Sequence, residues 1–174
     1  THAYTVDIHT LKVLQSAMND PMYKELSDQD KTILKIAALL HDTGKKGGVV
    51  DRGHASLSSD YTRAVLNKFQ LNVAVKTRII DIVDNHNWFE KHNTGQISAA
   101  TMAANCRRPE DFKISMILAK SDLSSVNPTF HFNKTGTTNQ AEFDAYMHDK
   151  VRPIEKKLEE MREKANIVFD TQFM

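Results

Sequence analysis

Several features that would point to a particular class of protein are scarce in this sequence. It holds one cysteine, Cys106, in 174 residues, so no disulfide can form within the chain and we expect a reducing, cytoplasmic compartment. No apolar run approaches the roughly 18 residues that a membrane-spanning helix needs, and residues 1–20 carry no signal-peptide pattern. The formal net charge is only +1, so no overall field favours nucleic acid or an anionic membrane as a partner.

Glycine and proline are also scarce, with 6 and 4 copies, and four of the glycines fall within residues 42–53. Elsewhere apolar residues recur every three or four positions, as on one face of an amphipathic helix, and no alternating strand pattern is longer than a few residues. Ser27 and Asp30 resemble a capping box that opens the second helix. The pattern predicts an all-α fold, with helices over about 4–18, 27–41, 54–69, 72–86, 97–106 and 109–125.

The chain length suits a single domain with a sizeable core, and its 40% hydrophobic and 26% charged residues are ordinary for a globular protein. We expect one domain over residues 1–174, with a core over about 4–125. Residues 126–140 are polar and rich in Asn and Thr, which predicts a loop, and interleaved charges of both signs predict a long C-terminal helix over 141–166. Because the chain begins with Thr1 rather than Met, we expect a domain taken from a longer protein.

The pair His41-Asp42 directly follows a strongly apolar stretch, residues 33–40. An imidazole and a carboxylate at the end of a buried helix are costly to desolvate unless they are paired or bind a metal ion. Three other metal-competent side chains lie on or beside the apolar faces of predicted helices: His9, His86 and Asp122. Each has a structural alternative, since a lone buried histidine is more often a hydrogen-bonded core residue and a buried aspartate often caps a backbone amide. The residues alone leave both interpretations open.

The order of these residues along the chain resembles that of a known family. The HD superfamily of metal-dependent phosphohydrolases is defined by His, His-Asp and Asp on an all-helical core, and this chain resembles it at His9, at residues 41–45 (His-Asp-Thr-Gly-Lys) and at Asp122. Residues 4–11 resemble the uridylyl-removing region of bifunctional uridylyltransferases. The resemblance covers about residues 4–125 and implies a helical HD-type bundle.

The resemblance also implies ligands for a divalent cation, whose identity (Fe, Mn, Mg, Ni or Zn) the sequence does not distinguish. One ion would be bound by four residues: His9, His41, Asp42 and Asp122. In the two-metal branch of the family a second ion would add His54 and His86, with Asp42 bridging both ions. The alternative is a one-metal site in which His54 and His86 bind substrate phosphate. One departure from the pattern is Ser58, which stands where many relatives have a glycine, about four residues after the His54 position.

The function implied by the resemblance is hydrolysis of a phosphomonoester or phosphodiester, in a nucleotide or a nucleotidylated substrate, by a water that the metal activates. Asp42 and Lys45 would be catalytic, and Lys45 would bind the substrate phosphate together with Lys46 and Arg52. Lys46 and Arg52 have a simpler alternative as the solvated surface of a loop. The alternative to an enzyme is a catalytically silent HD-fold module that binds a ligand or regulates a partner.

Overall fold

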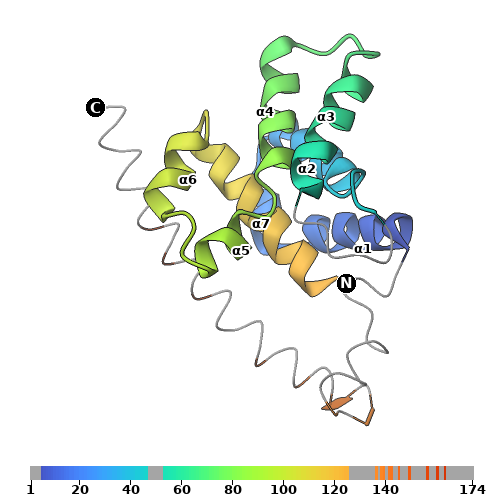
Figure 1. Ribbon diagram of the computed structural model, residues 1–174, viewed down its shortest axis with the longest axis vertical. Coiled ribbons are helices and arrows are strands. Elements are labelled where there is room, and N and C mark those ends of the chain that lie inside the picture. The colour runs from blue at the N-terminus through green and yellow to red at the C-terminus, as the bar shows by residue number, and fades with distance from the viewer. Residues whose placement is uncertain are drawn as a thin grey trace.

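The computed structural model describes residues 5–46 and 53–125, together with isolated positions between 136 and 163. All secondary structure in its two long segments is helical, which confirms the predicted all-α fold (Figure 1). The elements are α1 (Val6–Asn19), the 3-10 helix η1 (Pro21–Glu25), α2 (Asp28–Leu40), α3 (His54–Leu66), α4 (Val73–Asp84), α5 (Trp88–Asn93), α6 (Ala99–Asn105) and α7 (Pro109–Ser124). The predicted loop over 126–140 and most of the predicted helix over 141–166 lie outside the described residues.

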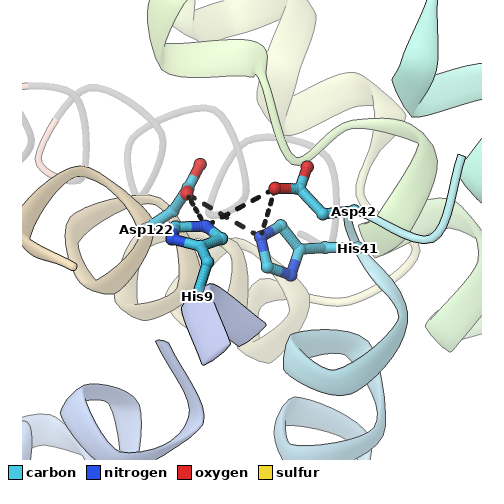
Figure 2. A group of neighbouring side chains, drawn as sticks. All are labelled: His9, His41, Asp42 and Asp122. Atoms are coloured by element: carbon cyan, nitrogen blue, oxygen red, sulfur yellow. Dashed lines mark hydrogen bonds and ion pairs between the residues drawn. The ribbon is translucent and has the colours of Figure 1, made fainter. Parts of the chain in front are cut away.

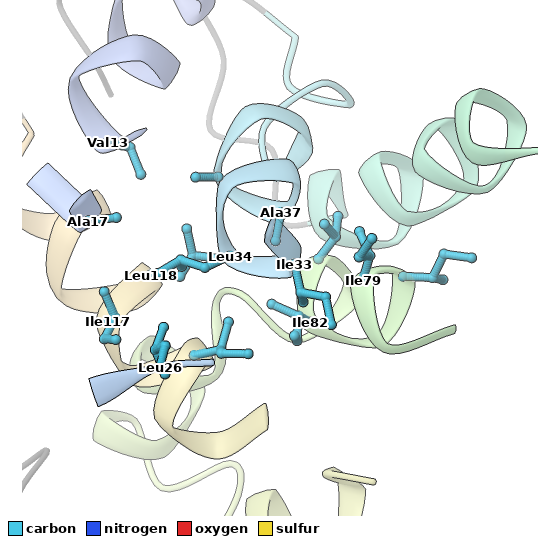
Figure 3. Close-up of a cluster of buried hydrophobic side chains, with 14 of the residues drawn as sticks. Val13, Ala17, Leu26, Ile33, Leu34, Ala37, Ile79, Ile82, Ile117 and Leu118 are labelled. Carbon is cyan, nitrogen blue, oxygen red and sulfur yellow. The ribbon is translucent and has the colours of Figure 1, made fainter. Parts of the chain in front are cut away.

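Helix α2 lies at the centre of the core, with α1, α4 and α7 packed against it, while α3 packs mainly against α4. The apolar stretch over residues 33–40 supplies this centre, and four of its side chains are fully buried: Ile33, Leu34, Ala37 and Ala38. They pack against buried side chains of the three surrounding helices (Figure 3), among them Val13, Ala17, Ile79, Ile82, Ile117 and Leu118. This packing fixes the relative positions of the helices that carry the candidate site residues. Among the described helices, none combines the length and the apolar character that crossing a bilayer demands.

The starts of η1 and α2 follow local sequence signals. The side chain of Asp20 accepts a hydrogen bond of 2.9 Å from the Met22 amide, and this cap opens η1, a short element that the helical pattern did not predict. The Ser27 hydroxyl accepts a hydrogen bond from the Asp30 amide at 3.2 Å and donates one to the Asp30 carboxylate at 2.7 Å. Ser27 and Asp30 therefore cap α2 as predicted.

We expect Ser27→Ala to lower the free energy of unfolding by about 1 kcal/mol, because the Asp30 amide loses its acceptor at the start of α2. Ser27→Thr keeps a hydroxyl group that can accept this hydrogen bond, so its free energy of unfolding should fall by less. Urea denaturation can be followed by the fluorescence of Trp88, which is the chain's one tryptophan and is fully buried. Equal stability of Ser27→Ala and the wild type would show that this cap contributes nothing.

A buried ion-pair network joins three of the core helices. Arg78 of α4 is 3% exposed, and it donates from Nη2 to Asp30 of α2 at 2.6 Å and from Nε to Asp111 of α7 at 2.7 Å. Burial alone would lower the pKa of Arg78. The two carboxylates raise it by more, so the pKa of Arg78 lies above its ordinary value. Burial raises the pKa of Asp111 in spite of its contact with Arg78. The arginine thus stays charged and holds two carboxyl groups inside the protein.

Candidate metal centre

The six predicted ligands come from the ends of five helices, and the structure brings their side chains together. His9 lies in the first turn of α1, His41 and Asp42 follow α2, His54 begins α3, His86 follows α4, and Asp122 lies in the last turn of α7. Because the apolar run of α2 stops at Leu40, the continuing chain places two polar side chains at the edge of the core. The convergence therefore follows from how the helices pack.

The ligand atoms form two sets that share one residue. Those of His9, His41, Asp42 and Asp122 all lie within 4.8 Å of one another, and we call these four residues the first set. Those of Asp42, His54 and His86 also lie within 4.8 Å of one another, and we call these three the second set. Sequence spacing alone did not show that the side chains meet.

Three of the histidines are held by the same kind of hydrogen bond. Their Nδ1 atoms lie close to backbone carbonyl oxygens: His9 to Ser125 at 2.9 Å, His41 to Ala38 at 2.8 Å, and His86 to Val83 at 2.6 Å. A carbonyl oxygen only accepts, so Nδ1 donates, and in a neutral ring the lone pair is then on Nε2. In its neutral form each ring therefore turns the lone pair of Nε2 toward the cluster, as a metal ligand does.

The first set is compact and largely buried (Figure 2). Nε2 of His9 lies 2.9 Å from Asp122 Oδ1 and 3.5 Å from Asp42 Oδ2. Nε2 of His41 lies 3.5 Å from Asp42 Oδ2 and 3.7 Å from Asp122 Oδ1. Donors that surround one cation at about 2.1 Å, in octahedral or tetrahedral geometry, are about 3.0–3.4 Å from their neighbours. The four donor atoms are thus spaced nearly as they would be around a common ion.

The hydrogen bonding of the first set argues against its interpretation as ordinary core residues. Nε2 of His41 is buried and makes no hydrogen bond to the described part of the chain. Both nitrogens of His9 face acceptors, the Ser125 carbonyl and the Asp122 carboxylate, although a neutral imidazole has one proton to donate. Buried polar atoms are normally paired, and imidazole nitrogens with carboxylate oxygens are common ligands of divalent Zn, Mn and Fe. The set therefore fits a divalent cation.

The second set uses the other oxygen of Asp42. Oδ1 of Asp42 lies 3.4 Å from His54 Nε2 and 3.6 Å from His86 Nε2, and these two nitrogens are 3.0 Å apart. Asp42 thus turns Oδ2 toward the first set and Oδ1 toward the second, as a bridging carboxylate does. The His54 side chain is 13% exposed, whereas the side chains of His86 and Asp42 are buried.

Both carboxylates of the cluster are ionised at neutral pH. Burial raises the pKa of Asp42, but the contact with His86 and the charge of His41 outweigh it, and the pKa lies well below its usual range. Burial also raises the pKa of Asp122, but its contacts with His41 and His9 outweigh this effect, so the pKa of Asp122 is likewise well below its usual range. Burial alone would lower the pKa of His41. The carboxylates of Asp122 and Asp42 raise it by more than burial lowers it, so the pKa of His41 lies above its ordinary value. Both carboxylates are therefore in the ionised form that binds a metal ion.

The predicted phosphate-binding residues are placed less completely. Nζ of Lys45 lies 2.9 Å from Asp42 Oδ2, and its side chain is 20% exposed, so it borders both the cluster and solvent. Lys46 is exposed. Arg52 lies outside the described residues, so its role stays a prediction.

The groups that orient the site were missed by sequence reasoning. They are backbone carbonyls, which no residue type marks. Ala38 and Val83 each lie three residues before the histidine that they hold, at a helix end, so this local spacing is a signal that could have been used. Ser125 lies 116 positions from His9, and no local pattern connects them.

An all-α core that gathers His, His-Asp and Asp side chains defines a class of helical domains with a candidate metal centre. The family model described as HD domain matches residues 6–121, more than half of the chain. The chain belongs to the HD domain family, and this membership places it in the superfamily of metal-dependent phosphohydrolases. The resemblance predicted from the motifs is thereby confirmed.

The chain is also similar to curated proteins from two strains of Caulobacter vibrioides, each named bifunctional uridylyltransferase/uridylyl-removing enzyme. The identity is 26% over 144 residues, which covers 73% of this chain and 15% of each relative. The chain thus spans about 15% of the length of the curated relatives that it matches.

Proposed function

We propose that this chain is a metal-dependent phosphohydrolase that cleaves a phosphomonoester or phosphodiester in a nucleotide or a nucleotidylated substrate. The observation that carries the proposal is the placement of Asp42, whose two carboxylate oxygens face two separate pairs of imidazole nitrogens. A purely structural aspartate has no need of four histidine partners. The family membership supports the same activity class.

In this proposal the first set (His9, His41, Asp42 and Asp122) holds one divalent cation, and the second set (Asp42, His54 and His86) holds another. Such cations, when bound, supply Lewis acidity toward phosphoryl oxygens and a water of lowered pKa. The part of the protein is to fix the geometry. Rings that donate Nδ1–H to backbone carbonyls keep Nε2 aimed at the centre, so no reorganisation is needed when the substrate arrives.

The balance of charge favours an anionic substrate. Two carboxylates, Asp42 and Asp122, offset only half the charge of two divalent ions, so the loaded centre attracts a phosphoester. Lys45 adds an ammonium group at the edge of the cluster. We assign to Lys45 the stabilisation of negative charge on the phosphoryl oxygens during attack. Lys46 and Arg52, from the same part of the chain, are assigned to phosphate binding.

The substrate class draws on the similar proteins. The name of the Caulobacter relatives includes uridylyl removal, and a uridylyl group is a nucleotide attached through its phosphate. This likeness supports a nucleotidylated substrate, or a free nucleotide, for the present chain.

We expect the chain loaded with Mn²⁺ to hydrolyse bis(p-nitrophenyl) phosphate or p-nitrophenyl phosphate, two chromogenic esters. EDTA should reduce the rate to background and added Mn²⁺ should restore it, because the activity depends on the cation. Elemental analysis of the same samples relates the rate to the metal bound. A metal-loaded chain that is inert toward both esters and toward a panel of nucleotides would instead support the catalytically silent binding module.

A further inference from the structure

Helix α3 closely approaches the segment that carries His41 and Asp42 where Gly44 meets Ser58. The Gly44 amide donates to Ser58 Oγ at 2.8 Å, and the Ser58 side chain is fully buried. A Cβ atom on Gly44 would lie 2.5 Å from the Ser58 nitrogen, 2.7 Å from the His54 oxygen and 2.9 Å from the Leu57 carbonyl carbon. All three are backbone atoms, which cannot move aside. Gly44 is therefore required for the close approach of the two backbones.

This contact joins two of the three parts of the chain that supply the second set; the third is the end of α4, which is followed by His86. Gly44 follows Asp42 by two residues, and Ser58 follows His54 by four, one turn along the same helix. The Gly44–Ser58 hydrogen bond is thus a direct link between the backbone next to Asp42 and the helix that begins at His54, whose Nε2 lies 3.4 Å from Asp42 Oδ1.

The first set shares only Asp42 with the second set, and Asp42 closely follows the end of α2 in the chain. Its residues belong to α1, to α7 and to the end of α2, and these helices pack directly on one another in the core. No residue of α3 is among them. We therefore expect a change at Ser58 to displace His54 of the second set, while Asp42 and the rest of the first set keep their positions on the packed helices α1, α2 and α7.

We propose that Ser58 is a positioning residue that, through Gly44, holds His54 against Asp42 and so sets the affinity of the second set for its cation. The inference rests on the proposed two-cation function. It also gives a physical role to the residue at which the sequence departs from the glycine of many relatives. The serine hydroxyl satisfies a buried amide that a glycine would leave without this acceptor.

Calorimetric titration of the full chain with Zn²⁺ tests the proposal. Wild type should bind two ions, and Ser58→Ala should weaken the second by about 10–100-fold, the usual cost of losing a group that orients a ligand, while the first is unchanged. Ser59→Ala is the matched control, since Ser59 is the adjacent buried serine of α3 and the acceptor of the Gly44 amide is Ser58. Equal weakening of both ions in Ser58→Ala, or no weakening, would overturn the proposal.

A measurement on the wild type keeps the test independent of how well the variant folds. If the contact favours the second cation, that cation must strengthen the contact by the same factor. Hydrogen exchange of the Gly44 amide should therefore slow with the second equivalent of Zn²⁺ and not with the first, and unchanged exchange would contradict the role of Ser58. A wild-type stoichiometry of one ion would overturn the two-cation function itself, whereas a change confined to Ser58→Ala concerns the positioning alone.

Discussion

Asp42→Ala should remove both cations from the chain and abolish hydrolysis. Asp42 is the one residue that belongs to both sets, with Oδ2 3.5 Å from the nitrogens of His9 and His41 and Oδ1 3.4 Å from that of His54. Its loss leaves one carboxylate in the first set and two imidazoles in the second. Because such cations contribute several kcal/mol to transition-state stabilisation, we expect the rate to fall about 1000-fold or more. Elemental analysis and initial rates measure the two effects.

Two further variants make this result specific. His54→Ala should release only the second cation, since His54 contributes to the second set alone. Asp60→Ala removes an exposed carboxylate from α3 and should change neither metal content nor rate. Circular dichroism and Trp88 fluorescence establish that each variant is folded. If Asp42→Ala retained its metal and a near-normal rate, the bridging role would be wrong.

Arg78→Ala should strongly lower the free energy of unfolding. It leaves the carboxyl groups of Asp30 and Asp111 buried without their cation, and breaking a buried pair in this way costs about 3–5 kcal/mol. An unpaired buried carboxyl has a raised pKa, so it binds its proton more tightly in the folded protein than in the unfolded chain. The loss of stability relative to the wild type should therefore grow as the pH rises from about 5 to 8. Urea denaturation of both proteins at the two pH values measures this.

The chain offers a matched control for the arginine. Arg107 pairs with Asp81 on the surface, with side chains 58% and 34% exposed, and an exposed pair of this kind contributes less than about 1 kcal/mol. Arg107→Ala should therefore be close to wild type. If Arg78→Ala were no more costly than Arg107→Ala, the buried network would not stabilise the fold.

Most of the fold was predictable because helical periodicity is a local property. Ile33, Leu34 and Ala37 are spaced so that one face of α2 is buried, and that spacing is visible in the sequence. The role of Arg78 was not predictable. Its partners Asp30 and Asp111 lie 48 and 33 positions away, so no local pattern distinguishes this arginine from a solvated one.

The same distinction applies to the site. The residue types and the order His, His-Asp, Asp were visible in the sequence, and the resemblance to a family selected among their interpretations. Their convergence depends on how α1, α2, α3, α4 and α7 pack, which spacing does not encode. The contact between Gly44 and Ser58 was invisible for a related reason. A glycine in an irregular segment signals a flexible or crowded backbone, but not which atom it approaches.

The first set has a consequence for the topology of the chain. His9 and Asp122 lie 113 positions apart, near the two ends of the helical core, and an ion coordinated by both would close that span into a ring. Secreted proteins achieve such a cross-link with a disulfide, which one cysteine cannot form. In the loop-closure treatment, a link across roughly 100 residues removes about 4–5 kcal/mol of entropy from the unfolded ensemble. A cell short of the metal would then hold a protein that is easier to melt and to degrade.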